Sequence, residues 1–136
     1  RAFSHTVSKQ GRSCVSCHND PVALGYGEGK LEFVARGPGR GRWRFTPAHA
    51  PGPDGLPADA WIAFLRTREH DVSTRDDVRP LSVDEQRRVL AVGACLTCHD
   101  GASRAMQDAM RGERPLLGRL SAKCRIPDWE ASAPAR

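Results

Sequence analysis

The chain has 136 residues and a formal net charge of +5, with 39% hydrophobic and only 6% aromatic residues. This length favours a single domain over 1–136, and the apolar content is modest for a core built from side chains alone. No stretch approaches the roughly 20 apolar residues of a membrane span. The basic residues are scattered among 16 acids, without interleaved aromatics or a recognisable module. This pattern argues against a nucleic-acid partner.

The N-terminal half contains loops and one predicted hairpin. Residues 1–13 lead, as a short helix or an extended segment, into a first Cys-x-x-Cys-His motif. A glycine-rich loop follows at 24–29, outside the strand-loop-helix context of a phosphate-binding loop, so its glycines predict close approach of the backbone to a cofactor. Residues 30–36 and 42–45 alternate between apolar and polar side chains, with Gly-Pro-Gly between them. This alternation predicts a short β-hairpin.

The C-terminal half is predicted to be helical. Pro57 is well placed to begin a helix that runs to about residue 68, because apolar residues recur there at helical spacing. After a charged linker, Ser82 and Glu85 form a capping box that opens a second helix. This helix runs towards His99, which is expected to project from its buried face. A third helix is predicted at 102–110, and the tail beyond residue 112 has no clear periodicity.

Two copies of Cys-x-x-Cys-His account for four of the five cysteines; their residues are Cys14, Cys17 and His18, and Cys95, Cys98 and His99. This pentapeptide is the attachment signature of c-type haem. Each thiol adds across a haem vinyl group, and the histidine becomes the proximal ligand of the iron. The sequence therefore predicts two covalently bound haem c groups, with His18 and His99 as proximal ligands.

Two other uses of these cysteines compete with haem attachment. Four thiolates from two segments can close a tetrahedral zinc site, but zinc ribbons do not require a histidine after each second cysteine, and their pairs usually lie closer together in sequence. Thioredoxin-like chemistry needs one motif at a helix start within a βαβ unit, and no such unit is visible. Haem attachment explains more of the pattern than either alternative.

The second axial ligand of each iron has several candidates. A histidine there gives a low-potential, six-coordinate electron carrier, a methionine raises the potential, and an open position permits ligand binding or catalysis. The spare histidines are His5, His49 in a proline-framed loop, and His70, which is the weakest of the three because it lies opposite the apolar helical face. Met106 and Met110 are expected to pack against the second haem. Because three spare histidines are available for two irons, the sequence favours bis-histidine ligation of both.

Cys124 is the fifth cysteine, and its role is open. An unpaired thiol in an exported protein either pairs between chains or is buried. The sequence indicates no partner for it within this chain.

The chain resembles the multihaem c-type cytochromes, either as a small dihaem member or as a two-haem module of a larger one. The resemblance is carried by the two motifs, by His5 upstream of the first, and by the runs 23–27, 79–81 and 92–96. The chain departs from the monohaem cytochrome c pattern, which has one motif and a downstream methionine.

The resemblance has implications for both fold and ligands. It implies a haem-organised multihaem architecture, and we expect a mainly α fold with long loops and one short β-hairpin. In this family a histidine before or between the motifs commonly supplies the sixth ligand, which supports His5 and one of His49 or His70. Closely spaced haems in the family pass electrons in series.

We therefore expect an electron carrier rather than an enzyme, with redox proteins, other multihaem cytochromes or copies of itself as partners. Two alternatives remain: a small enzyme with one open iron and peroxidase-like activity, and a subunit of a larger multihaem assembly or extracellular filament. Because haem c is attached outside the cytoplasmic membrane, a periplasmic or extracellular location is expected. The chain shows no signal peptide, so it is expected to be a mature form.

Overall fold

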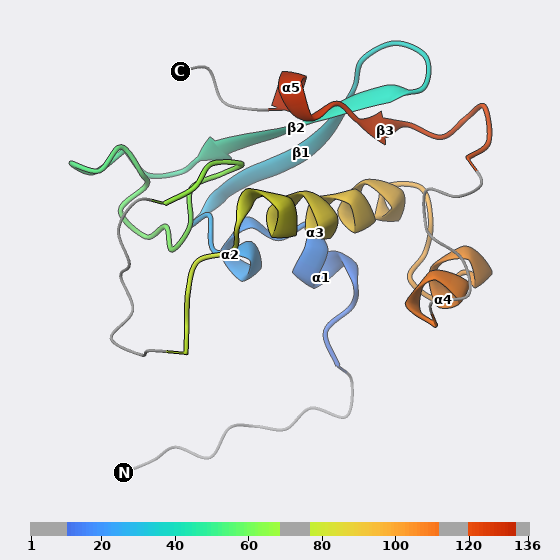
Figure 1. Cartoon of the computed structure of the whole chain (residues 1–136), viewed down its shortest axis with the longest axis horizontal. Coiled ribbons are helices and arrows are strands. Elements are labelled where there is room, and N and C mark those ends of the chain that lie inside the picture. Colours follow the sequence, from blue (N-terminus) through green and yellow to red (C-terminus); the bar gives the residue numbers. More distant parts are fainter. Residues whose placement is uncertain (1–10, 69–76, 112–119, 133–136) are drawn as a thin grey trace.

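The computed structural model describes residues 11–68, 77–111 and 120–132. Its centre is a three-stranded sheet in the order β1-β2-β3, formed by β1 (Gly29–Ala35), β2 (Arg40–Pro47) and β3 (Ile126–Pro127). The longest helix, α3, lies along one side of the sheet (Figure 1). The helices are α1 (Val15–His18), α2 (Pro21–Leu24), α3 (Val83–Leu96), α4 (Arg104–Met110) and α5 (Trp129–Ser132).

The expectation of a mainly α fold is wrong. Of the described residues, 31% are helical and 18% lie in strands, and the strands form one mixed sheet. Three of the five helices in the described part have only four residues. The difference arises because a segment expected to be helical is irregular, and because the tail contributes a strand.

The predicted hairpin is confirmed, with a second strand longer than the alternation indicated. β1 and β2 are antiparallel, and the register places Phe33 opposite Trp43 and Glu32 opposite Arg44. The first pair packs against the core, whereas the second forms an exposed ion pair at 2.9 Å. This period of two is the pattern of a sheet with one buried face.

The helix predicted at 57–68 is wrong, although its apolar residues are buried. The N–H groups of Trp61 and Ile62 both donate to the carbonyl oxygen of Gly25, each at 2.8 Å. Leu65 has a φ of +50°, and its N–H donates to a side chain of α3. Because distant partners satisfy these backbone groups, the segment needs no helical hydrogen bonds of its own.

The start of α3 is confirmed in detail. Ser82 Oγ accepts from the N–H of Glu85 at 3.3 Å, and the Glu85 carboxylate accepts from the N–H of Ser82 at 2.8 Å. The guanidinium of Arg79 binds the same carboxylate. Its hydrogen bonds, followed by those from Ser82, lower the pKa of Glu85 to about 2.

Gln86, on α3, joins three segments inside the core and is 1% exposed. Its Oε1 accepts from Tyr26 Oη at 3.1 Å and from the N–H of Leu65 at 2.7 Å. Its Nε2 donates to the carbonyl oxygens of Arg66 and Leu81. Burial also raises the pKa of Tyr26 far above its usual value. A single amide thus holds the irregular segment against α3.

The tail contributes more structure than its sequence suggested. β3 pairs parallel with β2, and the N–H of Trp43 donates to Ser132 Oγ at 2.9 Å. On its other side, Trp43 Nε1 donates to the carbonyl oxygen of Leu90 at 3.1 Å. The sheet is therefore tied both to α5 and to α3. The helix predicted at 102–110 is confirmed as α4.

No helix within the described ranges is long and apolar enough to cross a membrane.

Candidate functional site

The two Cys-x-x-Cys-His motifs, at 14–18 and 95–99, fold into the same helical turn. In each, the histidine N–H donates to the carbonyl oxygen of the first cysteine at 2.9 Å. The N–H of the second cysteine donates to the same oxygen, at 3.2 Å in the first motif and 3.1 Å in the second. Residues three and four apart lie on one face of such a turn. Each motif therefore directs two thiols and one imidazole to the same side.

A hydroxyl reinforces both turns in the same way. Ser16 Oγ donates to the carbonyl oxygen of Ser13 at 2.8 Å, and Thr97 Oγ1 donates to that of Ala94 at 2.7 Å. In both cases the acceptor lies directly before the first cysteine. The correspondence of Ser16 and Thr97 is visible in the sequence, but their hydrogen bonds were not predicted.

The ring of His18 is held by α3. Its Nδ1 lies 3.0 Å from the carbonyl oxygen of Val89, and His18 is partly buried. Because a carbonyl oxygen can only accept, Nδ1 carries a proton, and in the neutral ring Nε2 keeps the free lone pair. A hydrogen bond of this kind fixes the tautomer and the orientation of a metal-ligating histidine. Sequence reasoning missed it because the partner is a backbone atom.

α1 packs closely on α3 at Gly93. A Cβ at this position would lie 2.9 Å from the His18 carbonyl oxygen and 3.1 Å from the ring of Trp43. The Asn19 amide nitrogen, oriented to satisfy both acceptors, donates to the carbonyl oxygens of His18 at 3.0 Å and Gly93 at 3.3 Å. The small residue and the amide together hold the first motif against the helix that leads into the second.

The two motifs are close to one another. A Cβ at Gly101, two residues after the second motif, would lie 2.9 Å from Sγ of Cys14. The backbone that leaves the second motif thus passes beside the first thiol of the first motif. In Figure 1, the end of α3 and the start of α4 lie on the same side of the molecule as α1.

The second motif differs from expectation at its histidine. α3 ends at Leu96, so His99 follows the helix and is exposed, and its predicted position on the buried face is wrong. Within the described ranges, no hydrogen bond joins the His99 ring to another residue. Burial, and then the nearby thiols of Cys124 and Cys98, raise the pKa of Cys95. Cys124 is a free thiol, and its Sγ lies 3.4 Å from Oγ of Ser121.

The arrangement of the thiols is unlike a zinc site. Among the residues that the structure describes, which include all five cysteines, no three thiols lie within 4.8 Å of one another. A tetrahedral thiolate site needs four donors around one point. The cysteines are instead grouped in pairs, each pair with its own histidine.

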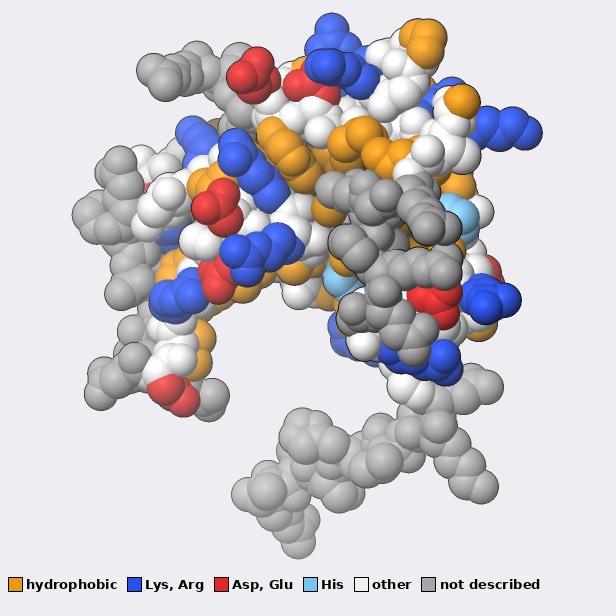
Figure 2. Space-filling model, turned by 45° about the vertical axis from the view of Figure 1, so that its right-hand side comes forward, with side chains coloured by type: hydrophobic (Ala, Val, Ile, Leu, Met, Phe, Trp, Pro, Cys, Tyr) orange, Lys and Arg blue, Asp and Glu red, His pale blue; other side chains and the backbone are white. Residues whose placement is uncertain are grey.

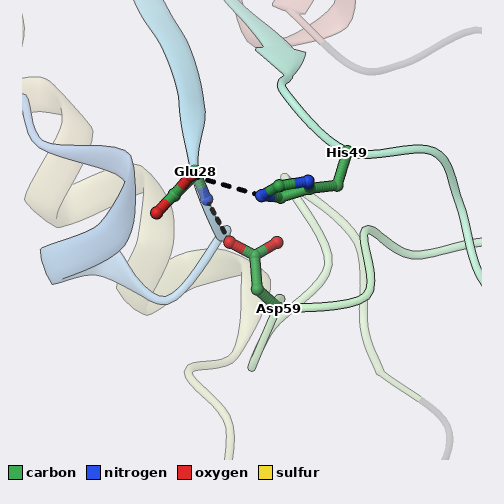
Figure 3. A group of neighbouring side chains, drawn as sticks. All are labelled: Glu28, His49 and Asp59. Atoms are coloured by element: carbon green, nitrogen blue, oxygen red, sulfur yellow. Dashed lines mark hydrogen bonds and ion pairs between the residues drawn. The ribbon is translucent and has the colours of Figure 1, made fainter.

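The predicted sixth ligands are only partly testable. His5 and His70 lie outside the described residues. His49 is exposed, with its Nε2 3.2 Å from Oε2 of Glu28, beside Asp59 (Figure 3). Met106 is buried at 3% exposure, whereas Met110 is 63% exposed.

The glycine-rich loop packs against protein. A Cβ at Gly25 would lie 3.1 Å from the Trp61 side chain, and one at Gly27 would lie 2.9 Å from Cγ of Asp59. Both glycines have positive φ values, +87° and +88°. These contacts explain the glycines without the close approach to a cofactor that their sequence suggested.

Two valines near the first motif are exposed. Val15, between the two cysteines, is 46% exposed, and Val22 in α2 is 57% exposed. Figure 2 shows hydrophobic side chains at the surface between separate groups of Lys and Arg. Exposed apolar side chains beside paired thiols and an oriented imidazole are the groups that would hold a porphyrin, itself a large apolar body.

No model of a known protein family, no curated protein and no solved structure matches this chain.

Proposed function

We propose that the chain is a dihaem c-type cytochrome that transfers electrons between redox partners. The observation that carries the proposal is the pair of equivalent helical turns, each presenting two cysteines and a histidine on one face. When bound, haem supplies an iron that takes up and releases one electron at a potential set by its axial ligands and surroundings.

The residues of the chain then have defined roles. Cys14 and Cys17 hold one haem, and Cys95 and Cys98 hold the other, through thioether bonds in which the thiol hydrogen moves to the vinyl group. His18 and His99 are the proximal ligands. The bond from His18 Nδ1 to the Val89 carbonyl supports this role, because it leaves Nε2 available to a metal.

The contact between Cys14 and Gly101 supports electron passage between the two haems. Haems attached at these two adjacent segments would lie near one another. On this proposal no substrate bond is made or broken, and the partners are redox proteins, other multihaem cytochromes or further copies of the chain. On this proposal, covalent attachment of haem c implies a location in the periplasm or outside the cell.

The proposal is tested by expressing the exported chain in a host that attaches haem c, followed by mass spectrometry of the denatured protein. We expect the mass of two covalently bound haems. Replacing Cys14 and Cys17 by Ser, or Cys95 and Cys98 by Ser, is expected to remove one haem each. Cys124→Ser is the matched control and is expected to keep both. A chain that carries no haem in this host would contradict the proposal.

The ligation state is tested by absorption spectra of the reduced protein before and after carbon monoxide is added. Bis-histidine ligation predicts no spectral change at either haem, since both axial positions hold strong ligands. A response by one haem would show an open or labile iron and favour the enzyme alternative.

A further inference from the structure

Outside the two motifs, Glu28, His49 and Asp59 bring their side chains together on the surface, as Figure 3 shows. Each offers one ligand atom, and these atoms all lie within 4.8 Å of one another. The three residues come from separate segments: the turn before β1, the loop after β2, and the irregular segment that follows. We infer that this cluster binds a first-row divalent cation of the zinc type, independently of haem.

The main chain positions the three ligands relative to one another. The N–H of Glu28 donates to Oδ2 of Asp59 at 2.6 Å. The Glu28 carbonyl oxygen accepts from the N–H of Ala48, the neighbour of His49, at 2.9 Å. Gly27, with a φ of +88°, leaves room for the Asp59 carboxylate where any Cβ would collide with it. Ligands held by the backbone in this way lose less conformational entropy when a cation binds.

The charge of the cluster favours a cation. Two carboxylates share the site, and the polar neighbour of Glu28 Oε2 is Nε2 of His49, at 3.2 Å. Among the described residues, no Lys or Arg forms an ion pair with Glu28 or Asp59. A divalent cation would neutralise both carboxylates at once, which a single imidazole cannot do.

The donor set identifies the class of cation. An imidazole nitrogen with two carboxylates suits zinc and its neighbours, whereas calcium and magnesium prefer oxygen donors alone. Zinc–ligand bonds of about 2.0–2.2 Å place tetrahedral donors about 3.4 Å apart. The Glu28–His49 separation of 3.2 Å already matches this value. The ligand atom of Asp59 lies within 4.8 Å of the other two, and rotation of this exposed side chain brings it to the same separation. Three protein ligands leave the fourth position to water.

The inference assigns His49 to this cation rather than to a haem iron. A cation here would fasten the loop after β2 and the irregular segment to the start of β1. Binding of the cation is then expected to hold these loops in place without changing the number of haems attached to the chain. The inference does not depend on the proposed function, because none of its residues belongs to a Cys-x-x-Cys-His motif.

The test uses the haem-loaded protein, stripped with a chelator and titrated with Zn²⁺ alone by isothermal calorimetry. Thioether formation removes the motif cysteines as competing ligands. We expect one saturable site that is weakened by about tenfold or more in His49→Ala and in Asp59→Asn. Asp54→Asn is the matched control: it lies in the same loop region, is paired with Arg68, and is expected to bind Zn²⁺ like the wild type.

Carbon monoxide spectra of the His49→Ala protein separate the two possible roles of His49. The inference predicts that the haem spectra are unchanged while zinc affinity falls. Absence of a saturable site, or a site equally tight in both variants, overturns it. If His49→Ala opens a haem to carbon monoxide, His49 is an axial ligand; the zinc assignment is then wrong and the cytochrome proposal stands.

Discussion

Gln86→Leu provides a direct test of how the core is held together. The substitution keeps roughly the volume of the side chain but removes the acceptor of the Tyr26 hydroxyl and of the Leu65 N–H. Both donors are then left inside the core, since Tyr26 and Gln86 are each 1% exposed. A buried unsatisfied donor costs about 1–3 kcal/mol. Allowing for the apolar gain of leucine, we expect a loss of about 2–4 kcal/mol in the free energy of unfolding.

A double-mutant cycle with Tyr26→Phe checks the stated cause. In the wild type, Tyr26→Phe removes one hydrogen bond and is expected to cost about 0.5–1.5 kcal/mol. In the Gln86→Leu background it removes an unsatisfied hydroxyl, so its cost is expected to vanish or change sign. Urea unfolding of the haem-loaded protein, followed by far-ultraviolet circular dichroism, measures the free energy of unfolding of the wild type, the two single variants and the double variant. Equal costs in both backgrounds, or a loss below about 0.5 kcal/mol for Gln86→Leu, would refute the reasoning.

Three further predictions concern pH and packing. The pKa of Glu85 is about 2 in the fold against 4.5 ordinarily. Its contribution to stability is therefore present above about pH 4.5 and is lost as the pH falls towards 2. Glu85→Gln is expected to make the melting temperature less dependent on pH over that range. The pKa of Tyr26 is raised by burial, so stability is expected to fall above about pH 10, where the unfolded chain ionises first, and Tyr26→Phe is expected to abolish this part of the fall. Gly93→Ala is expected to lower the melting temperature despite the better helix propensity of alanine, because its Cβ would press on the His18 carbonyl oxygen; an unchanged or higher melting temperature would show that α1 can shift freely.

The features that could be predicted from the sequence are those that depend on neighbouring residues. The two motifs are short and self-contained, and each forms its turn through hydrogen bonds between neighbouring residues. The capping box at Ser82 and the alternation around Phe33 are also local patterns, and both predicted their elements correctly.

The errors arise where partners are distant in the sequence. The spacing of Trp61, Ile62 and Leu65 correctly predicted burial, but Gly25 and Gln86 supply the hydrogen bonds that replace a helix. β3 has two residues, too few for any periodicity, and it exists through its pairing with β2.

The candidate site shows the same division. The two motifs are visible in the sequence, whereas the Val89 carbonyl that orients His18 has no side-chain signature. Gly93 did carry a usable signal, since a glycine inside a helix costs about 1 kcal/mol against alanine and indicates close packing. His99 was misplaced because the helical projection was continued past Leu96, where the helix ends.

The hydrogen bond between His18 and Val89 also limits how the chain can be divided. It joins residues 71 positions apart, and Val89 lies in the helix that leads into the second motif. A cut anywhere between His18 and Val89 separates this imidazole from the group that orients it. An N-terminal fragment that ends before Val89 would keep the cysteines and histidine of the first motif. It would lose the hydrogen bond that fixes the orientation of the His18 ring. The two motifs therefore belong to one folding unit. They are not two independent modules that could be duplicated, exchanged or expressed separately.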